Sequence, residues 1–523
     1  MSDTTTETFR LAPVEPAQQT TEPTAEPSRP GPRQWVALGV LALTALLLSL
    51  DVSVLYLALP ALAADLGAST TQQLWMLDIY SFVLAGFLVT MGAVGDRIGR
   101  RRLLLVGAVA FGLASVGAAY AASPGQLVLW RAVLGMAGAT LMPSTMGLIR
   151  TIFTDEKSMM TAIGIWYSCF MGGMAAGPLV GGLLLQHFWW GSAFLLGVPF
   201  MVLLVVVGHR VLPESDRRAG ARLDLTSSLL SLAAILPMIH GFKEIARGGN
   251  PATAGVTLVA GLAVGVLFFR RQRRIENPLV DLALFRSRAF STALAVMLVG
   301  GVVMAGVSFL STQWLQLVAG LDPLGAGLWM LPANLALLVG SISSASVGRR
   351  LGIARTMTGG LAVCAAGLAL YTQVGPAAGL GLLVAGMVLT SFGIMLPSTL
   401  TMSVMMQSAP PERAGSVASL SETSGEFGIA VGVAGLGSLA AFVYRGELQP
   451  YAAEHPSSAT TVALDSLAGA AQAAAHLPAA AASELLAVAE GAFTTSLNVV
   501  AGVGAALFVV VAVATMRVLR PTD

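Results

Sequence analysis

The chain has 523 residues, of which 55% are hydrophobic and only 11% are charged, and its mean hydropathy is +0.77. Because soluble domains carry about 25% charged residues, this composition excludes a soluble globular protein and predicts an integral membrane protein. Its two cysteines exclude a disulfide scaffold and a thiolate metal cluster. The net charge of +2 excludes little, but the distribution of charge along the chain is informative.

Fourteen apolar segments are each long enough, at about 20 residues, to cross a ~30 Å hydrocarbon core as a helix. A helix satisfies all of its own backbone hydrogen bonds inside a bilayer, so we expect an all-α integral membrane protein. The segments lie near residues 35–60, 73–94, 103–121, 126–148, 159–184, 191–212, 224–243, 252–270, 289–316, 324–347, 355–374, 378–406, 412–443 and 492–517.

Basic residues are concentrated on one side of these segments. Of the 29 Lys and Arg residues, all but four fall in tails and loops that a cytoplasmic N-terminus would leave inside; the four are Lys243, Arg247 and Arg445 on the other side and Arg131 within a span. The positive-inside rule therefore predicts that both termini are cytoplasmic. The Arg-, Ala- and Gly-rich composition favours a bacterial source, so the expected location is a bacterial cytoplasmic membrane.

The loop after the second span places one acid among four arginines and three glycines. It reads Gly92-Ala-Val-Gly-Asp96-Arg97-Ile-Gly99-Arg100-Arg101-Arg102. The positive-inside rule accounts best for Arg101 and Arg102, but not for Asp96 or for the glycine spacing. This spacing resembles the loop signature of the major facilitator superfamily. The resemblance implies that Gly92, Asp96, Arg97, Gly99 and Arg100 form a latch that holds the helices of one half in one of two conformations.

Two motifs recur at nearly the same distance along the chain. Val94-Gly-Asp-Arg-Ile-Gly recurs as Val347-Gly-Arg-Arg-Leu-Gly 253 residues later, and Leu141-Met-Pro-Ser-Thr recurs as Met395-Leu-Pro-Ser-Thr 254 residues later. We therefore expect two duplicated six-helix halves with two helices inserted between them, and a binding site at the interface of the halves.

This repeat divides the chain into five parts. They are a disordered cytoplasmic tail over residues 1–34, an N-terminal half over 35–212, an inserted region over 213–288, a C-terminal half over 289–517 and a cytoplasmic tail over 518–523. The C-terminal half contains an Ala-rich extracellular loop over 445–491. We expect two short helices in this loop, starting near Ser458 and Ser483 and separated by a break at Pro478.

Four acids lie well inside the predicted spans: Asp51, Asp78, Glu422 and Glu426. An ionised side chain at the bilayer centre costs at least a few kcal/mol, so such residues usually face a cavity and have a function. Helix capping or packing is the alternative for Asp51. Glu422 and Glu426 are four residues apart and share one helix face. Because two close carboxylates repel each other, at least one of them should hold a proton near neutral pH.

Arg131 is the basic residue inside a span, at the same depth as Asp78. A buried guanidinium needs a carboxylate or backbone carbonyls as partners. The pattern Leu127-x-x-x-Arg131-x-x-x-Gly135 resembles the fourth-span motif of the same superfamily, which is associated with proton coupling. A purely structural ion pair is the alternative.

The fifth span contains Gly173-Met-Ala-Ala-Gly177-Pro178-Leu-Val-Gly181-Gly182. Glycines four residues apart allow close helix approach, and a proline inside a helix kinks it. The longer pattern resembles the antiporter signature of the superfamily's exporters.

Together with Leu50–Pro60 and Gln73–Ser81, these motifs resemble the fourteen-helix drug:proton antiporter branch of the superfamily. The run from Ser421 to Gly428 and the long loop before the last span more narrowly resemble its quaternary-ammonium (Qac-type) multidrug efflux pumps. The resemblance implies proton coupling by Asp51 and Arg131, and cation binding or protonation by Asp78, Glu422 and Glu426. The sequence departs from the pattern in the tenth span, which holds no acid.

Several aromatic and sulfur-containing side chains within the spans would suit a flat lipophilic cation, through cation–π contacts and adaptable thioethers. For each of them, packing against lipid is the simpler alternative. The candidates are Trp166, Tyr167, Phe170, Met142 and Met395, with Trp314 and Phe392 less central.

We therefore expect a proton-coupled antiporter that exports lipophilic cationic drugs by alternating access; the alternative is an exporter dedicated to one antibiotic or metabolite. The expected partners are these cations, protons and the lipid bilayer, with no nucleic acid, and the chain is expected to be a monomer. The proton gradient takes the place of a cofactor, and no metal is expected. An enzyme is disfavoured because the chain lacks G-x-S-x-G and H-E-x-x-H motifs, and nothing in it resembles a channel's selectivity loop.

Overall fold

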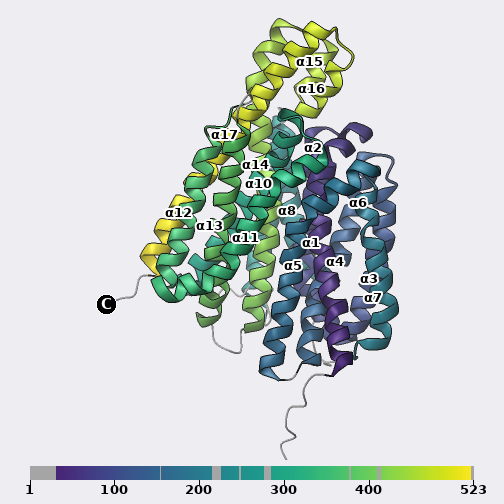
Figure 1. Cartoon of the computed structure of the whole chain (residues 1–523), viewed down its shortest axis with the longest axis vertical. Coiled ribbons are helices and arrows are strands. Elements are labelled where there is room, and N and C mark those ends of the chain that lie inside the picture. The colour runs from purple at the N-terminus through teal and green to yellow at the C-terminus, as the bar shows by residue number, and fades with distance from the viewer. Residues whose placement is uncertain are drawn as a thin grey trace, which may run out of the picture.

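A computed structural model describes residues 31–153, 155–214, 225–246, 249–275, 284–375, 379–408 and 414–519. The regular elements within these ranges are all helical, and most run side by side as one bundle (Figure 1). Thirteen helical stretches are long and apolar enough to cross a membrane. With α2, which packs inside the bundle, the described chain reaches the fourteen expected spans. The protein is a multi-pass membrane protein of the expected all-α class.

Serine residues cap two helices of the first half at their starts. Ser69 and Ser123 precede the second and fourth helices, and each accepts a hydrogen bond from the backbone of the first helical turn. The expected sixth span is broken at Leu196 into a short and a long helix. The helices are α1 (Pro32–Leu66), α2 (Thr70–Ile98), α3 (Arg100–Ala119), α4 (Pro124–Ile152), α5 (Glu156–His187), α6 (Ser192–Leu195) and α7 (Gly197–Val211).

The inserted pair and the second half follow. The inserted helices are α8 (Leu225–Ala246) and α9 (Pro251–Gln272), and a short 3-10 helix, η1 (Leu284–Arg286), comes next. The second half consists of α10 (Arg288–Gln313), which continues as the π-helical turn η2 (Trp314–Val318), α11 (Pro323–Leu351), α12 (Ile353–Tyr371), α13 (Leu380–Gln407), α14 (Ala414–Glu454) and α17 (Ala479–Val518).

The backbone carries the same repeat as the sequence. Gly67 and Gly320 have φ values of 61° and 65°. Gly67 precedes α2, and Gly320 precedes α11, which corresponds to α2 in the repeat. Gly99 and Gly352 have φ values of 105° and 84° and form one-residue turns between α2 and α3 and between α11 and α12. Both pairs are separated by 253 residues. Side chains rarely adopt positive φ, so glycine is required at these four turns.

Two equivalent interfaces join the halves. The α2 helix packs against α14, and α11 packs against α5. In the repeat, α11 corresponds to α2 and α14 corresponds to α5, so the two interfaces are copies of each other. The inserted helix α8 contacts both α2 and α14 and therefore covers the first interface. Asp78 of α2 and Glu426 of α14 belong to the helices of that interface, whereas α11 holds no acid within its span.

The end of the bundle near Gly67 carries a helical extension (Figure 1). The helices α14 and α17 are 41 and 40 residues long and continue past the other helices. The short helices α15 (Ser458–Ala463) and α16 (Leu467–Ala474) join them. Two short helices were expected here, but the second begins after Ser466 and not near Ser483. Ser483 lies inside α17, which starts directly after Pro478 because proline suits a helix start.

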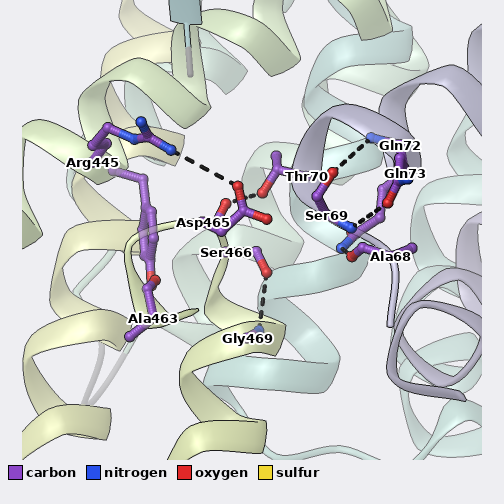
Figure 2. A network of polar contacts seen from close by, with 11 residues as sticks. Ala68, Ser69, Thr70, Gln72, Gln73, Arg445, Ala463, Asp465, Ser466 and Gly469 are labelled. Carbon is purple, nitrogen blue, oxygen red and sulfur yellow. Dashed lines mark hydrogen bonds and ion pairs between the residues drawn. The ribbon is translucent and has the colours of Figure 1, made fainter. Parts of the chain in front are cut away.

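A polar clasp holds this extension against the start of α2 (Figure 2). Thr70 donates a hydrogen bond to the carbonyl of Asp465, and the Asp465 carboxylate lies 3.8 Å from the Arg445 guanidinium. Tyr444 donates a 2.9 Å hydrogen bond to the carbonyl of Ala463. The clasp therefore links the second half of the chain to α2 of the first half.

Candidate functional site

Asp51 and Arg131 form a buried ion pair between α1 and α4. The Arg131 Nη1 atom lies 3.1 Å from the Asp51 Oδ2 atom, and Nε donates a 3.0 Å hydrogen bond to the carbonyl of Met76 on α2. The guanidinium also lies 4.5 Å from the centre of the Tyr80 ring. Arg131 thus has the carboxylate and carbonyl partners that its burial requires.

Glycine allows this approach of α4 to α2. A Cβ atom at Gly135 would collide with the carbonyl of Tyr80, and one at Gly138 would lie 3.0 Å from the Tyr80 hydroxyl. The Tyr80 backbone therefore lies directly against α4, one helical turn beyond Arg131. The spacing Arg131-x-x-x-Gly135 thus places the guanidinium and the helix contact on the same face of α4.

Asp78 forms a second buried ion pair, with Lys243 on the inserted helix α8. The Lys243 Nζ atom lies 2.7 Å from the Asp78 Oδ2 atom and 4.1 Å from the centre of the Trp75 ring. The side-chain exposures of Lys243 and Asp78 are 1% and 0%. Lys243 therefore lies inside α8, and the span expected over residues 224–243 ends too early. The missed signal is Ile245, which continues the apolar helix beyond the lysine.

A small cavity lies between the two ion pairs. Its volume is about 10 Å³, which is room for about one water molecule. Asp78 and Arg131 both line it, so each ion pair contributes one charged member. The other lining residues come from both halves and are Val52, Leu55, Tyr56, Leu77, Ser81, Ile429, Ala430 and Val433. The site therefore lies at the interface of the halves, as the repeat predicts.

The helix α14, which carries Glu422 and Glu426, also supplies the wall of this cavity that belongs to the second half. Glu426 is half-buried and lies within electrostatic reach of both Tyr56 and Tyr80. Its neighbour Phe427 packs edge-on against Phe82 of α2, with ring centroids 6.5 Å apart. The side chain of Glu422 lies outside the described residues.

Three of the predicted aromatic residues gather on α5, a different part of the bundle, whereas Trp314 lies in η2 and Phe392 on α13. Trp166 stacks on Phe170 at 6.0 Å, and Tyr167 lies 6.5 Å from the same ring. The α5 helix packs against α1 and α11. The residues described as lining the cavity beside Asp78 include none from α5. These three aromatic residues therefore form a cluster separate from that cavity.

The two predicted methionines also lie apart from the ion pairs. Met142 is half-buried on α4 and packs against the hydrophobic core. Met395 is buried on α13, where its Cβ atom faces Gly340 of α11. Neither methionine is among the described residues that line the cavity beside Asp78.

The latch residues lie at the opposite end of α2, around the Gly99 turn. Arg100 donates a 3.4 Å hydrogen bond to the carbonyl of Pro143, and its guanidinium covers Gly147 of α4, where a Cβ atom would displace the Arg100 side chain. Gly92 of α2 also faces the side chain of Pro143 on α4. Arg97 is exposed. The side chain of Asp96 lies outside the described residues.

The glycines of α5 are packing positions. A Cβ atom at Gly173 would collide with Ser49 and the carbonyl of Leu46 on α1, and one at Gly177 would collide with Ser53. Gly181 continues this row against Val54. On the other face, Gly182 lies against Pro323 and Leu324 of α11, while the Pro178 carbonyl faces Gly327. The motif therefore brings α5 close to both α1 and α11.

Two repeated helical halves with a buried charged site between them define a membrane transporter. The chain belongs to the Major Facilitator Superfamily, whose sequence model matches residues 41–433.

Solved structures of membrane transporters share the fold at low sequence identity. A bacterial homolog of the human lysosomal transporter Spinster has a TM-score of 0.63 and 15% identity, covering 94% of this chain and 99% of its own. The peptide transporter POT has a TM-score of 0.62 and 16% identity, covering 92% and 95%.

Sequence relatives are more similar. The multidrug efflux pump LfrA of Mycolicibacterium smegmatis is 40% identical over 95% of this chain and 98% of its own length. The methyl viologen resistance protein SmvA of Salmonella typhimurium is 35% identical over 78% and 82%. The puromycin resistance protein pur8 of Streptomyces alboniger is 34% identical over 82% and 85%.

Proposed function

We propose that this protein is a proton-coupled antiporter that exports lipophilic cations by alternating access. The observation that carries the proposal is the pair of buried carboxylates, Asp51 and Asp78, whose ion pairs each contribute one charged residue, Arg131 and Asp78, to one cavity at the interface of the halves. Buried acids of this kind bind cations or protons. The names of the relatives, which include a multidrug efflux pump and a methyl viologen resistance protein, support the same class of substrate.

In this proposal the two carboxylates have different roles. Asp51 takes up the coupling proton, because its charge holds Arg131 and through it α2 and α4. Asp78 binds the cation, because it lies beside the Trp75 ring, whose face attracts positive charge. Glu426 adds a negative charge from the other half. Neutralising Asp51 releases Arg131 and favours the conformation that discharges the cation.

We place both termini in the cytoplasm of a bacterial cell and the α15–α16 extension outside, with the protein acting as a monomer in the cytoplasmic membrane. The distribution of Lys and Arg supports this orientation. The clasp between Thr70, Asp465 and Arg445 then lies on the outer side, and proton entry from that side requires it to open.

Flux in liposomes that contain only this protein tests the proposal. Ethidium movement is followed with an imposed pH gradient, with the gradient collapsed by an uncoupler, and in empty liposomes. We expect saturable, gradient-driven ethidium movement and a matching proton flux in the opposite direction. Ethidium transport that is unaffected by collapse of the gradient contradicts proton coupling, and the absence of saturable transport contradicts cation export.

A dedicated exporter of one antibiotic is the second candidate. It is supported by relatives named for single compounds, such as the tetracenomycin C resistance and export protein of Streptomyces glaucescens, 32% identical over 78% of this chain. Resistance profiles in a cell without its own efflux pumps separate the two candidates. Protection against several unrelated cations supports the multidrug function, and protection against one neutral or anionic compound alone supports the second.

A further inference from the structure

The Asp78 site is already occupied by a cation that belongs to the protein. A carboxylate beside the face of an indole ring is a complete recognition site for an ammonium group. In the structure the Lys243 Nζ atom fills it, 2.7 Å from Asp78 and 4.1 Å from the centre of the Trp75 ring. The lysine comes from the inserted helix α8, which is not part of either repeated half.

The site is only partly satisfied by this lysine. The second carboxylate oxygen of Asp78, Oδ1, is buried and has no hydrogen-bond partner among the described residues. A buried carboxylate oxygen without a donor is destabilising. A purely structural ion pair would be expected to saturate both oxygens, so the geometry favours a site that exchanges its cation.

A second position for the lysine lies on its other side. A cavity of about 10 Å³ is lined by Lys243 together with Ser438, Asp465 and Thr70. The Ser438 hydroxyl is buried and has no hydrogen-bond partner among the described residues. The charged groups at this cavity are Asp465 and Arg445, which lie 3.8 Å apart in the clasp. A displaced ammonium would therefore meet a hydroxyl acceptor and a carboxylate that it shares with the Arg445 guanidinium.

We propose that Lys243 is a tethered competitor, which occupies the cation position between Asp78 and Trp75 in the substrate-free protein and moves to the Ser438 cavity when a lipophilic cation binds. The proposal rests on the proposed cation export. It gives the inserted helix a role in transport. Exchange of one monovalent cation for another keeps Asp78 paired throughout, which avoids an isolated buried carboxylate. The return of Lys243 expels the substrate without requiring Asp78 to be protonated.

Amine labelling of the unmodified protein tests this directly, because the chain has only two lysines, Lys157 and Lys243. The purified protein is reductively methylated with and without saturating tetraphenylphosphonium, and each lysine is quantified by mass spectrometry. We expect the cation to raise the labelling rate of Lys243 at least about fivefold. The reason is that the state in which Lys243 pairs with Asp78 becomes rare once the cation has displaced it. Lys157 serves as the internal reference, and its rate should not change.

Equilibrium binding of tetraphenylphosphonium to the same sample separates the two proposals. If the wild-type protein binds none of the cation, the proposed cation export is wrong. If it binds the cation and the labelling of Lys243 stays constant, the tethered competitor is wrong while cation export stands.

Substitution provides an independent measurement. At pH 8.5, Lys243→Gln should lower the apparent dissociation constant for tetraphenylphosphonium about tenfold, the factor for a competitor that fills the site about nine-tenths of the time. Lys243→Arg keeps a tethered cation and should not tighten binding. A structural ion pair predicts unchanged or weaker binding in Lys243→Gln, and that result overturns the proposal. If Lys243→Gln does not fold, the labelling of the unmodified protein decides.

Discussion

Arg131 on α4 holds Asp51 on α1 at 3.1 Å while its Nε atom donates to the backbone of α2. One side chain therefore joins three helices of the first half. Removal of the Asp51 charge frees one end of this connection and leaves the other in place. A proton on Asp51 would thus change how α1 is held without unfolding the bundle.

Asp51→Asn should abolish proton-driven export and leave the protein folded and inserted in the membrane. Asparagine keeps the shape of aspartate but does not titrate. Flux in liposomes at a fixed pH gradient measures the effect, with thermal stability measured on the same samples. The matched control is Asp65→Asn on the same helix, where the carboxylate is exposed and accepts a 2.6 Å hydrogen bond from Trp190. Wild-type flux in Asp51→Asn would remove this residue from proton coupling.

Glu426→Gln should weaken the binding of a dication more than that of a monocation. Glu426 is half-buried near Tyr56 and Tyr80 of the candidate site. Because glutamine is neutral, the second positive charge of a bound dication loses its nearest counter-ion in this variant. We expect about a tenfold increase in the dissociation constant for the dication, equivalent to about 1.4 kcal/mol, and a smaller increase for ethidium. Equal losses for both substrates, or a larger loss in Glu422→Gln, would assign the role differently.

Gly173→Ala should destabilise the protein, whereas Gly172→Ala should not. A Cβ atom at Gly173 collides with Ser49 and the Leu46 carbonyl, but one at Gly172 meets nothing within 4 Å. Overpacking of this kind costs about 1–3 kcal/mol, while alanine is the better helix former at an open position. Thermal unfolding in detergent compares the adjacent variants. Equal melting temperatures would show that α5 can move away from α1 without cost.

Arg100→Gln should reduce the maximal transport rate more than it weakens substrate binding. Arg100 contacts the Pro143 carbonyl and covers Gly147 at the end of α2 remote from Asp78. The matched control is Arg102→Gln, because the Arg102 side chain is 59% exposed. Rates and dissociation constants are measured in the same liposomes. A tenfold loss of affinity at an unchanged maximal rate is the result that rules out a latch.

Asp96→Ala is the corresponding test of the acid in the latch. The resemblance to the superfamily's loop signature assigns Asp96 to conformational change, so its loss should also slow turnover more than it weakens binding. The same flux and binding measurements apply. A similar effect in both variants would indicate that Asp96 and Arg100 act together.

The architecture was predictable because membrane spans and repeats leave direct signals in the sequence. The length of each apolar segment predicts a membrane span. The recurring Gly-containing loop motif indicated the duplication, and Gly99 and Gly352 in its two copies both have positive φ values. The glycine spacing around Gly173 correctly predicted close helix packing, because only the absence of a side chain allows it.

The partners of the buried charges were only partly predictable. The need of Arg131 for a carboxylate follows from burial, but its choice of Asp51 depends on how α1, α2 and α4 meet. Lys243 was missed because its position near the end of a predicted span is also where snorkelling lysines occur. Its pairing with Asp78 depends on the inserted α8 lying against α2, and no local pattern encodes that docking.

The long helices α14 and α17 have a practical consequence for imaging. At 1.5 Å per residue a helix of 41 residues is ~60 Å long, about twice the thickness of the hydrocarbon core. The remainder, joined by α15 and α16, is a folded feature beyond the bundle (Figure 1). Small transporters embedded in micelles usually lack such a landmark for particle alignment. An antibody fragment raised against this extension would fix the orientation of each particle without touching the α2–α3 end.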